Sequence, residues 1–472
     1  MKSAAVILAL TLAAGGLPVI IENSNIPIPG RANLLQKLSQ SPDANAAADA
    51  LLLHYQAAGY PATSVEIEDR HGQRFVKVDV ARFANISLGD GPLRTRKIAD
   101  RHFAPLTNQP VYFPDFNARL ETFHANSLHR AVPRLQPSDN GGVDALLRLE
   151  QSAASQFSAG YLDTGTHPLP RERFWIQGEF SDLWNHNSLT SARLTFSPHP
   201  ADFHALQLGG RFFRQDGSEM VTALSYSGAR ADFFDAYTWQ VSGEWRNPES
   251  SRGDWKLRSG MGFTFRRSNN ALEFGDATSK GLADVFQLSA TQSLERSWQS
   301  GLTRITANLV ISPFGSDGDH GTLRPGASAE YGIVRTSVWH RQDLSADWDL
   351  IATLDGQWAS DPVLQADQFA LGGAAALRGL PEQFALGDRG WLGGLELRTP
   401  VIPLTESWKL RTSYFLQTGT TFDRVLKTRT QATTGGLGWQ IGHDDSLRAS
   451  LYSGWRLDEG GAEIHSQLTW KF

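Results

Sequence analysis

The sequence predicts a transmembrane antiparallel β-barrel of about 16 strands, preceded by two small αβ modules. Three observations support this fold class. The first 150 residues mix helical and strand periodicity, whereas the remainder alternates apolar and polar residues up to the last position. The alternating stretches run to about ten residues, the length that crosses a bilayer at a tilt. No apolar run of about 18 residues follows the N-terminus, which excludes a bundle of membrane-spanning helices.

Composition narrows the classes of function. The chain has 472 residues, a formal net charge of −5 and no Cys. A slightly acidic chain without a long basic run lacks the basic patch with which proteins bind nucleic-acid phosphates, so no nucleic-acid partner is expected. The absence of Cys excludes disulfides, thiolate zinc sites and Cys nucleophiles.

Residues 1–16 have the layout of a secretory signal peptide. Lys2 precedes the apolar stretch Ala4 to Ala14, and small residues follow it. A buried first helix is the alternative interpretation, and the cleavage site stays open. An exported chain without Cys fits a Gram-negative periplasm or outer membrane better than a eukaryotic secreted protein, in which disulfides are common.

The first αβ module is expected at residues 22–88. Asp43 is predicted to open a helix in which Ala47, Leu51 and Tyr55 share one face, and Gly59 is predicted to end it. The segments VEIE (65–68) and RFVKVDVARF (74–83) read as strands.

The second module, expected at 89–150, repeats this plan. Asp115 is predicted to cap a short helix with Phe116, Leu120 and Phe123 on one face. The segments HRAVPRL and VDALLRLE then read as strands.

Residues 151–472 are assigned to the barrel. In a typical stretch, Tyr237, Trp239 and Val241 lie on one face, with Thr238 and Gln240 opposite. A soluble β-sandwich would also alternate. Charged residues at mid-strand on the polar face indicate a water-filled lumen, and Trp at the ends of the apolar face indicates an interfacial girdle. At roughly 20 residues per strand and connection, the region holds about 16 strands.

The last strand alternates up to the terminal residue. Leu468, Trp470 and Phe472 fall on its apolar face. A terminal aromatic residue in such a strand is typical of an assembly signal, so the outer-membrane barrel assembly machinery is an expected partner.

The stretch at 368–398 reads QFALGGAAALRGLPEQFALGDRGWLGGLELR. A charge at the bilayer midplane costs about 2–4 kcal/mol, so a Gly- and Ala-rich segment with Arg378 at its centre is a poor lipid-facing strand. It is predicted to fold back into the lumen and to place Arg378 against an acceptor on the barrel wall. An exposed loop with an incidental Arg is the alternative.

This stretch resembles a known signature. The patterns F-x-L-G-G, L-R-G-L and G-D-R-G-W-L-G-G-L-E-L-R are similar to loop six of the TpsB transporters of two-partner secretion, the ShlB/FhaC/HecB haemolysin secretion/activation family. Their wider superfamily includes the BamA-type insertases. Parts of two POTRA domains are resembled by AAGYPATSVEIE and by the stretch from PVYFPDF to LLRLE. The family's first barrel strands are resembled by AGYLDTGT and RFWIQGEF. The resemblance covers nearly the whole mature chain.

The resemblance implies an outer-membrane translocator with its POTRA domains in the periplasm. Its partners would be a large secreted TpsA-like exoprotein and outer-membrane lipids, and it would be a monomer without cofactors. The residues expected to gate the barrel are Leu377, Arg378, Gly379 and Leu380. The residues expected to bind the unfolded exoprotein lie in the second POTRA domain: Phe116, Leu120, Phe123, Val132 and Leu135.

The chain departs from the family pattern at three points. Leu380 replaces the aromatic residue of V-R-G-Y or V-R-G-F. Gln417 stands where the family usually has an Asp that pairs with the loop arginine; a carboxylate would form a bond roughly twice as strong, so Asp388, Glu396 or Asp423 are further candidate acceptors. No plug helix is expected between Leu17 and Asn33.

Other functions are weighed against this one. A POTRA-barrel insertase for membrane proteins is the first alternative, and a porin or receptor barrel is the second. An enzyme is not expected, because no spacing among the loop residues repeats a metal or triad template. These loop residues are His186, His199, His204, Asp317, Asp319 and His320.

Overall fold

The computed structural model describes residues 6–10, 19–23, 38, 43–70, 73–139, 141–150, 154–166, 168–184, 187–274 and 277–472. The chain divides into two compact units. Unit 1 comprises Met1–Ala154 with Trp184–Asn187, and unit 2 comprises Ser155–Leu183 with Ser188–Phe472.

Unit 1 begins with a four-stranded sheet in the order β1-β2-β4-β3. Its elements are β1 (Val6–Leu10), β2 (Val19–Asn23), α2 (Ala44–Ala57), β3 (Thr63–Arg70) and β4 (Gln73–Val80). Residues Val6–Leu10 of the expected signal peptide pair with β2, and the rest of 1–16 lies outside the described residues. No plug helix was expected between Leu17 and Asn33. Residues 24–33 of this region also lie outside the described residues.

The helix of this module is the one predicted. The Asp43 side chain caps the helix by accepting a hydrogen bond from the backbone N–H of Ala46 at 2.8 Å, so the helix begins where it was expected. The buried face of α2 packs against alternate residues of β4, because the helical and strand periods each present one apolar face to the core. The core comprises Leu38, Ala47, Ala48, Leu51, Tyr55, Val76, Val78 and Val80.

The second module has a three-stranded sheet in the order β5-β7-β6, with β5 parallel to β7. Its elements are β5 (Phe83–Leu88), α3 (Leu93–Phe103), η1 (Ala104–Leu106), α4 (Phe113–His124), β6 (Ala131–Pro137) and β7 (Val143–Leu149). β6 and β7 match the predicted strands. β5 pairs in this sheet although its residues fall within the range expected for the first module.

Two features of the second module differ from the prediction. α4 begins at Phe113 with Tyr112 as N-cap, so Asp115 lies in the first turn, where its charge stabilises the helix dipole instead of capping it. Helix α3 was not predicted, because its sequence LRTRKIADRHF is dominated by charged residues. Its buried face is nevertheless continuous and comprises Thr95, Ile98, Ala99, His102 and Phe103.

His102 makes the second module sensitive to pH. Its Nε2 donates to the carbonyl of Arg119 at 2.7 Å, and Arg119 Nη1 donates back to the carbonyl of His102 at 2.9 Å. Burial lowers the pKa of His102 below its ordinary value, and the hydrogen bond to Arg119 only partly opposes this shift. The unfolded module therefore binds a proton at a higher pH than the folded one, so stability is complete above about pH 6.5 and falls as the pH drops below it.

We therefore expect hydrogen–deuterium exchange of α3 and α4 in the full-length protein to accelerate between pH 7 and pH 5, after correction for intrinsic rates. His102→Gln keeps a hydrogen-bond donor but takes up no proton, so it should reduce this dependence. The remainder would report His124, whose pKa is lowered by burial as well. An unchanged pH dependence in His102→Gln would contradict this assignment.

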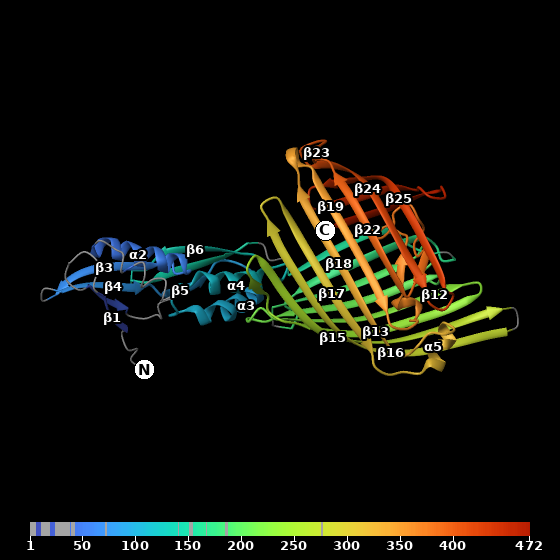
Figure 1. Cartoon of the computed structure of the whole chain (residues 1–472), viewed down its shortest axis with the longest axis horizontal. Helices are drawn as coiled ribbons and strands as arrows, with labels where there is room; N and C mark the ends of the chain where they lie inside the picture. Colours follow the sequence, from blue (N-terminus) through green and yellow to red (C-terminus); the bar gives the residue numbers. More distant parts are fainter. Residues whose placement is uncertain are drawn as a thin grey trace. The chain divides into compact units, whose positions relative to one another are not determined.

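Unit 2 is a closed antiparallel barrel (Figure 1), which confirms the predicted fold class. Its 16 long strands are β8 (Ser155–Asp163), β9 (Glu172–Ser181), β10 (Ser188–Phe196), β11 (Phe203–Phe213), β12 (Glu219–Ala231), β13 (Phe234–Arg246), β15 (Trp255–Phe274), β16 (Ala277–Trp298), β17 (Gly301–Ser312), β18 (Tyr331–Asp343), β19 (Asp349–Ala359), β22 (Arg389–Arg398), β24 (Trp408–Asp423), β25 (Thr428–His443), β26 (Leu447–Arg456) and β27 (Ala462–Lys471). The short strands β14 (Ser250–Arg252) and β23 (Ile402–Pro403) extend the wall at two turns.

The barrel wall separates apolar from polar residues as the alternation predicted. Large apolar side chains such as Tyr237, Val241 and Met261 are exposed on its outside, where they can face lipid. Polar residues such as Arg266 and Gln287 are buried by contacts on the lumen side of the wall. In the described ranges, no helix has the length and apolar character needed to span a membrane.

The barrel closes between its last and first long strands. β27 pairs with β8, with Leu468 opposite Tyr161, and the backbone N–H of Phe472 donates to the carbonyl of Phe157 at 3.0 Å. Leu468, Trp470 and Phe472 are all exposed. They thus form an apolar end to the closing strand, and their role as an assembly signal stays a prediction.

Candidate functional site: a reentrant segment in the barrel

The connection between β19 and β22, residues 360–388, folds against the inner wall of the barrel. It contains a 3-10 turn, η3 (Gln365–Asp367), and a two-stranded sheet of β20 (Phe369–Leu371) and β21 (Ala385–Gly387). The stretch 368–398 thus has two parts: the reentrant segment up to residue 388, and strand β22, which belongs to the wall.

Arg378 at the tip of the reentrant segment is held by the wall. Its backbone N–H and its Nε donate to Gln417 Oε1 at 3.0 and 3.2 Å, and its Nη1 lies 2.8 Å from Glu396 Oε2. The guanidinium stacks over the rings of Phe415 and Tyr452, at 4.0 and 5.0 Å from their centroids. Only 9% of the Arg378 side chain is exposed. Two of the four acceptors considered, Gln417 and Glu396, therefore contact it together.

The other two acceptors considered, Asp388 and Asp423, contact Arg324 instead. Arg324 Nη1 lies 2.6 Å from Asp388 Oδ1, and Arg324 Nη2 lies 3.0 Å from Asp423 Oδ2. Asp388 also accepts from the backbone N–H groups of Val363 and Arg424, at 2.9 and 2.8 Å. Arg324, in the β17–β18 connection, thereby ties together the β19–β22 connection and the last residue of β24, which lie at the same end of an antiparallel barrel. The sequence offered no spacing that could have identified this arginine.

Leucines fix the tip of the segment. Leu377 is fully buried and Leu380 nearly so, in a cluster with Leu371, Leu392 and Ala432. The leucine that replaces the family's aromatic residue at 380 thus packs in an aliphatic site. The carbonyl of Leu380 also accepts a hydrogen bond from His465 Nε2 at 3.1 Å, a contact that the sequence did not indicate.

Two glycines allow the tip to touch the wall backbone to backbone. Gly379 has φ +99°, a conformation that L side chains rarely adopt. A Cβ on Gly454 of β26 would lie 2.6 Å from the Cα of Gly379 and 2.7 Å from the carbonyl oxygen of Arg378. Gly454 is therefore part of the site, although no local sequence pattern marks it.

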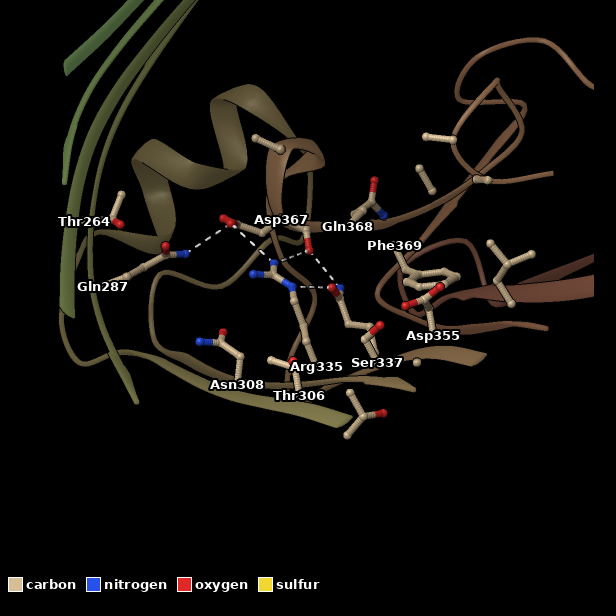
Figure 2. Close-up of a pocket in the computed structure, with 18 of the residues that line it drawn as sticks. Thr264, Gln287, Thr306, Asn308, Arg335, Ser337, Asp355, Asp367, Gln368 and Phe369 are labelled. Carbon is tan, nitrogen blue, oxygen red and sulfur yellow. Dashed lines mark hydrogen bonds and ion pairs between the residues drawn. The ribbon is translucent and has the colours of Figure 1, made fainter. Parts of the chain in front are cut away.

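A polar cavity of about 700 Å³ lies between the wall and residues 363–370, which we call the root of the segment. Hydrogen-bonding side chains such as Thr264, Asn308 and Ser337 line one side, and residues 366–370 line the other. Figure 2 shows Gln287 and Arg335 directed at Asp367 across this space. Such a polar lining is suited to water.

The five residues expected to bind an unfolded chain differ in exposure. Phe116 and Phe123 lie in the core of the second module, and Leu120 and Leu135 pack against that core. Val132 on β6 is the one of the five that is exposed. The helical periodicity that selected these phenylalanines marks the core-facing side of α4, so they offer no surface to a partner.

Two of the loop residues named above, His320 and Asp317, have structural roles. The His320 ring bonds through Nδ1 to the carbonyl of Ser328 at 3.0 Å, and Asp317 accepts from the backbone N–H of Ala329 at 2.6 Å. His186 lies outside the described residues. Across the described part of the chain, no three His, Asp or Glu side chains converge as a metal site.

Residues 261–442 match the sequence model of a family described as haemolysin secretion/activation protein ShlB/FhaC/HecB. The resemblance inferred from the loop motif is thereby confirmed. This stretch runs from β15 to β25 and includes the whole reentrant segment. No curated protein matches the chain in sequence.

Solved structures share the fold over nearly the whole chain. CdiB from Escherichia coli is 15% identical, with a TM-score of 0.82 over 98% of this chain and 91% of its own. CdiB from Acinetobacter baumannii is 12% identical, with a TM-score of 0.71 over 98% and 90%. BamA from Haemophilus ducreyi lacking POTRA domains 1–3 is 12% identical, with a TM-score of 0.56 over 97% and 100%. These likenesses extend the shared fold to the αβ modules.

Proposed function

Because the chain belongs to the ShlB/FhaC/HecB family, whose members are outer-membrane TpsB transporters without enzymatic activity, we propose that it exports a partner exoprotein by two-partner secretion. The exoprotein would be a large TpsA-like protein that reaches the periplasm unfolded and passes through the barrel to the cell surface. The signature arginine docked on the inner wall is the observation that carries the proposal. A segment held by side chains can leave the lumen, whereas a continuous wall strand cannot.

The αβ modules supply the expected contact with the unfolded exoprotein. β5 and β6 are the edges of the second module's sheet, and an extended peptide can add a strand to such an edge. Val132 lies on β6 and is exposed, so it could contact a side chain of the added strand. The binding surface proposed here is therefore the β6 edge, rather than the buried face of α4.

Transport would need no nucleotide. The chain has no phosphate-binding motif, and its LGG at 371–373 lacks the strand-to-helix context of a phosphate loop. Folding of the exoprotein outside the cell would prevent its return and make transport directional.

The test is surface display of the exoprotein encoded beside this protein. We expect it at the cell surface when both proteins are produced, and in the periplasm when this one is deleted. Persistence at the surface after deletion would contradict export. A loss of unrelated barrel proteins from the outer membrane instead would favour the insertase.

A further inference from the structure

Asp367 is a buried carboxylate near the start of the reentrant segment. It is 4% exposed, and Arg266 of β15 binds both of its oxygens, at 2.5 and 3.3 Å. Gln287 of β16 donates to Asp367 Oδ1 at 3.1 Å, and the Tyr331 hydroxyl of β18 donates to Oδ2 at 3.0 Å. The Asp367 carbonyl accepts from Gln357 of β19 at 2.8 Å. Four wall strands therefore converge on this one residue.

Asp367 and Arg378 dock on different parts of the wall. The partners of Asp367 are on β15 to β19, whereas those of Arg378 are on β22, β24 and β26. The barrel order places these two groups of strands next to each other without overlap. The segment thus crosses from one part of the wall to the other.

The apolar contacts divide in the same way. Val363 and Leu364, beside Asp367, pack in a cluster with residues of β16 to β19 and the β17–β18 connection, such as Val285 and Ile333. Leu377 and Leu380 pack in a separate cluster with β22 and β25. Each docking region therefore has its own buried ion pair and its own apolar core.

We propose that Asp367 is a second anchor of the reentrant segment, so that the segment undocks in two steps. Loss of the Arg378 contacts frees the tip, while the root stays on β15 to β19. Loss of the Asp367 contacts is required to free the whole segment. Only the purpose of the two-step undocking rests on the proposed export function. The two anchors themselves can be measured without an exoprotein.

The tip is the weaker of the two sites. Part of the Arg378 docking goes to the neutral Gln417, and its carboxylate partner Glu396 is shared with Arg398 at 2.8 Å. Asp367 instead receives a two-point charge-assisted pair and two further hydrogen bonds. Release of the tip alone is accordingly the first step.

Because the natural chain has no Cys, a single introduced thiol reports undocking cleanly. Leu377→Cys reports the tip and Leu364→Cys reports the root, since both leucines are buried in the docked segment. The rate of modification by a bulky water-soluble maleimide is measured on the full-length protein in liposomes. Retained fast migration of unheated samples in SDS gels verifies that the barrel is folded.

In Arg378→Ala we expect at least tenfold faster labelling of Leu377→Cys and unchanged labelling of Leu364→Cys. In Asp367→Asn we expect at least tenfold faster labelling of Leu364→Cys. Asp361→Asn, a half-exposed carboxylate of the same connection, should change neither rate. If Asp367→Asn prevents folding, Tyr331→Phe removes one hydrogen bond from Asp367, and a smaller increase at Leu364→Cys is expected.

Equal acceleration of both thiols by Arg378→Ala would overturn the proposal, because the segment would then move as one body. Unchanged labelling of Leu364→Cys in folded Asp367→Asn or Tyr331→Phe would also overturn it. Neither labelling result depends on export, so a failure of the proposed function would appear separately, in the surface-display experiment.

Discussion

Arg378→Ala is expected to leave the barrel folded and to raise its ionic conductance strongly. Removing one partner of a buried ion pair typically costs about 3–5 kcal/mol. Glu396 keeps Arg398 as a partner, so the lower end applies here. About 3 kcal/mol shifts the ratio of undocked to docked tips by roughly a hundredfold. The measurement is single-channel recording in planar bilayers, with export of the exoprotein as a second readout.

Matched variants separate loss of docking from loss of charge. Arg304 of β17 pairs with Glu295 and is half exposed, so Arg304→Ala removes an arginine and an ion pair from the wall without touching the segment. Its conductance should remain that of the natural chain. Gln417→Asp gives Arg378 a charged acceptor and should lower the frequency of openings. Natural conductance and export in Arg378→Ala would remove Arg378 from the mechanism.

The barrel could be predicted from sequence because its physical cause is local. Each wall strand must present one face to lipid and one to the lumen. The alternation of apolar and polar residues, such as Trp239 and Gln240, therefore indicates a barrel strand. Asp43 likewise indicates where α2 begins, because a capping side chain bonds to the backbone within one helical turn. Helix α3 escaped prediction because only three of the residues on its buried face, Ile98, Ala99 and Phe103, are apolar, and the face is completed by Thr95 and His102.

The site was predictable only in part, for the same reason. Arg378 stands out because a charge within a Gly- and Ala-rich stretch needs an explanation. The family resemblance points to Gln417 as its acceptor, whereas nothing in the sequence separates Glu396, which contacts Arg378, from Asp388 and Asp423, which contact Arg324. Arg324 and Gly454 are 54 and 76 positions from Arg378 in the sequence, and neither has a local pattern that marks it. Contacts of this range follow from strand order and register, which periodicity does not specify.

Gly454→Ala is expected to undock the tip although it removes no polar group. The new Cβ would lie 2.6 Å from the Gly379 Cα and 2.7 Å from the Arg378 carbonyl oxygen, closer than real Cβ atoms approach. Both obstacles are backbone, so no side chain can rotate away, and the tip itself must move. Since Arg378 is adjacent to Gly379, this movement should also lengthen its contacts with Gln417. Conductance should therefore rise toward that of Arg378→Ala.

Gly435→Ala on the neighbouring strand is the control for this prediction. Gly435 pairs with the exposed Trp455, so its Cβ would point outward, where the nearest atom is the Phe415 carbonyl oxygen at an ordinary 3.5 Å. Both variants replace a strand glycine in the same part of the wall, but only Gly454→Ala meets the segment. If the two gave the same conductance, close backbone packing would not be what holds the tip. A large effect of Gly454→Ala alone would show that shape, as well as charge, keeps the barrel closed.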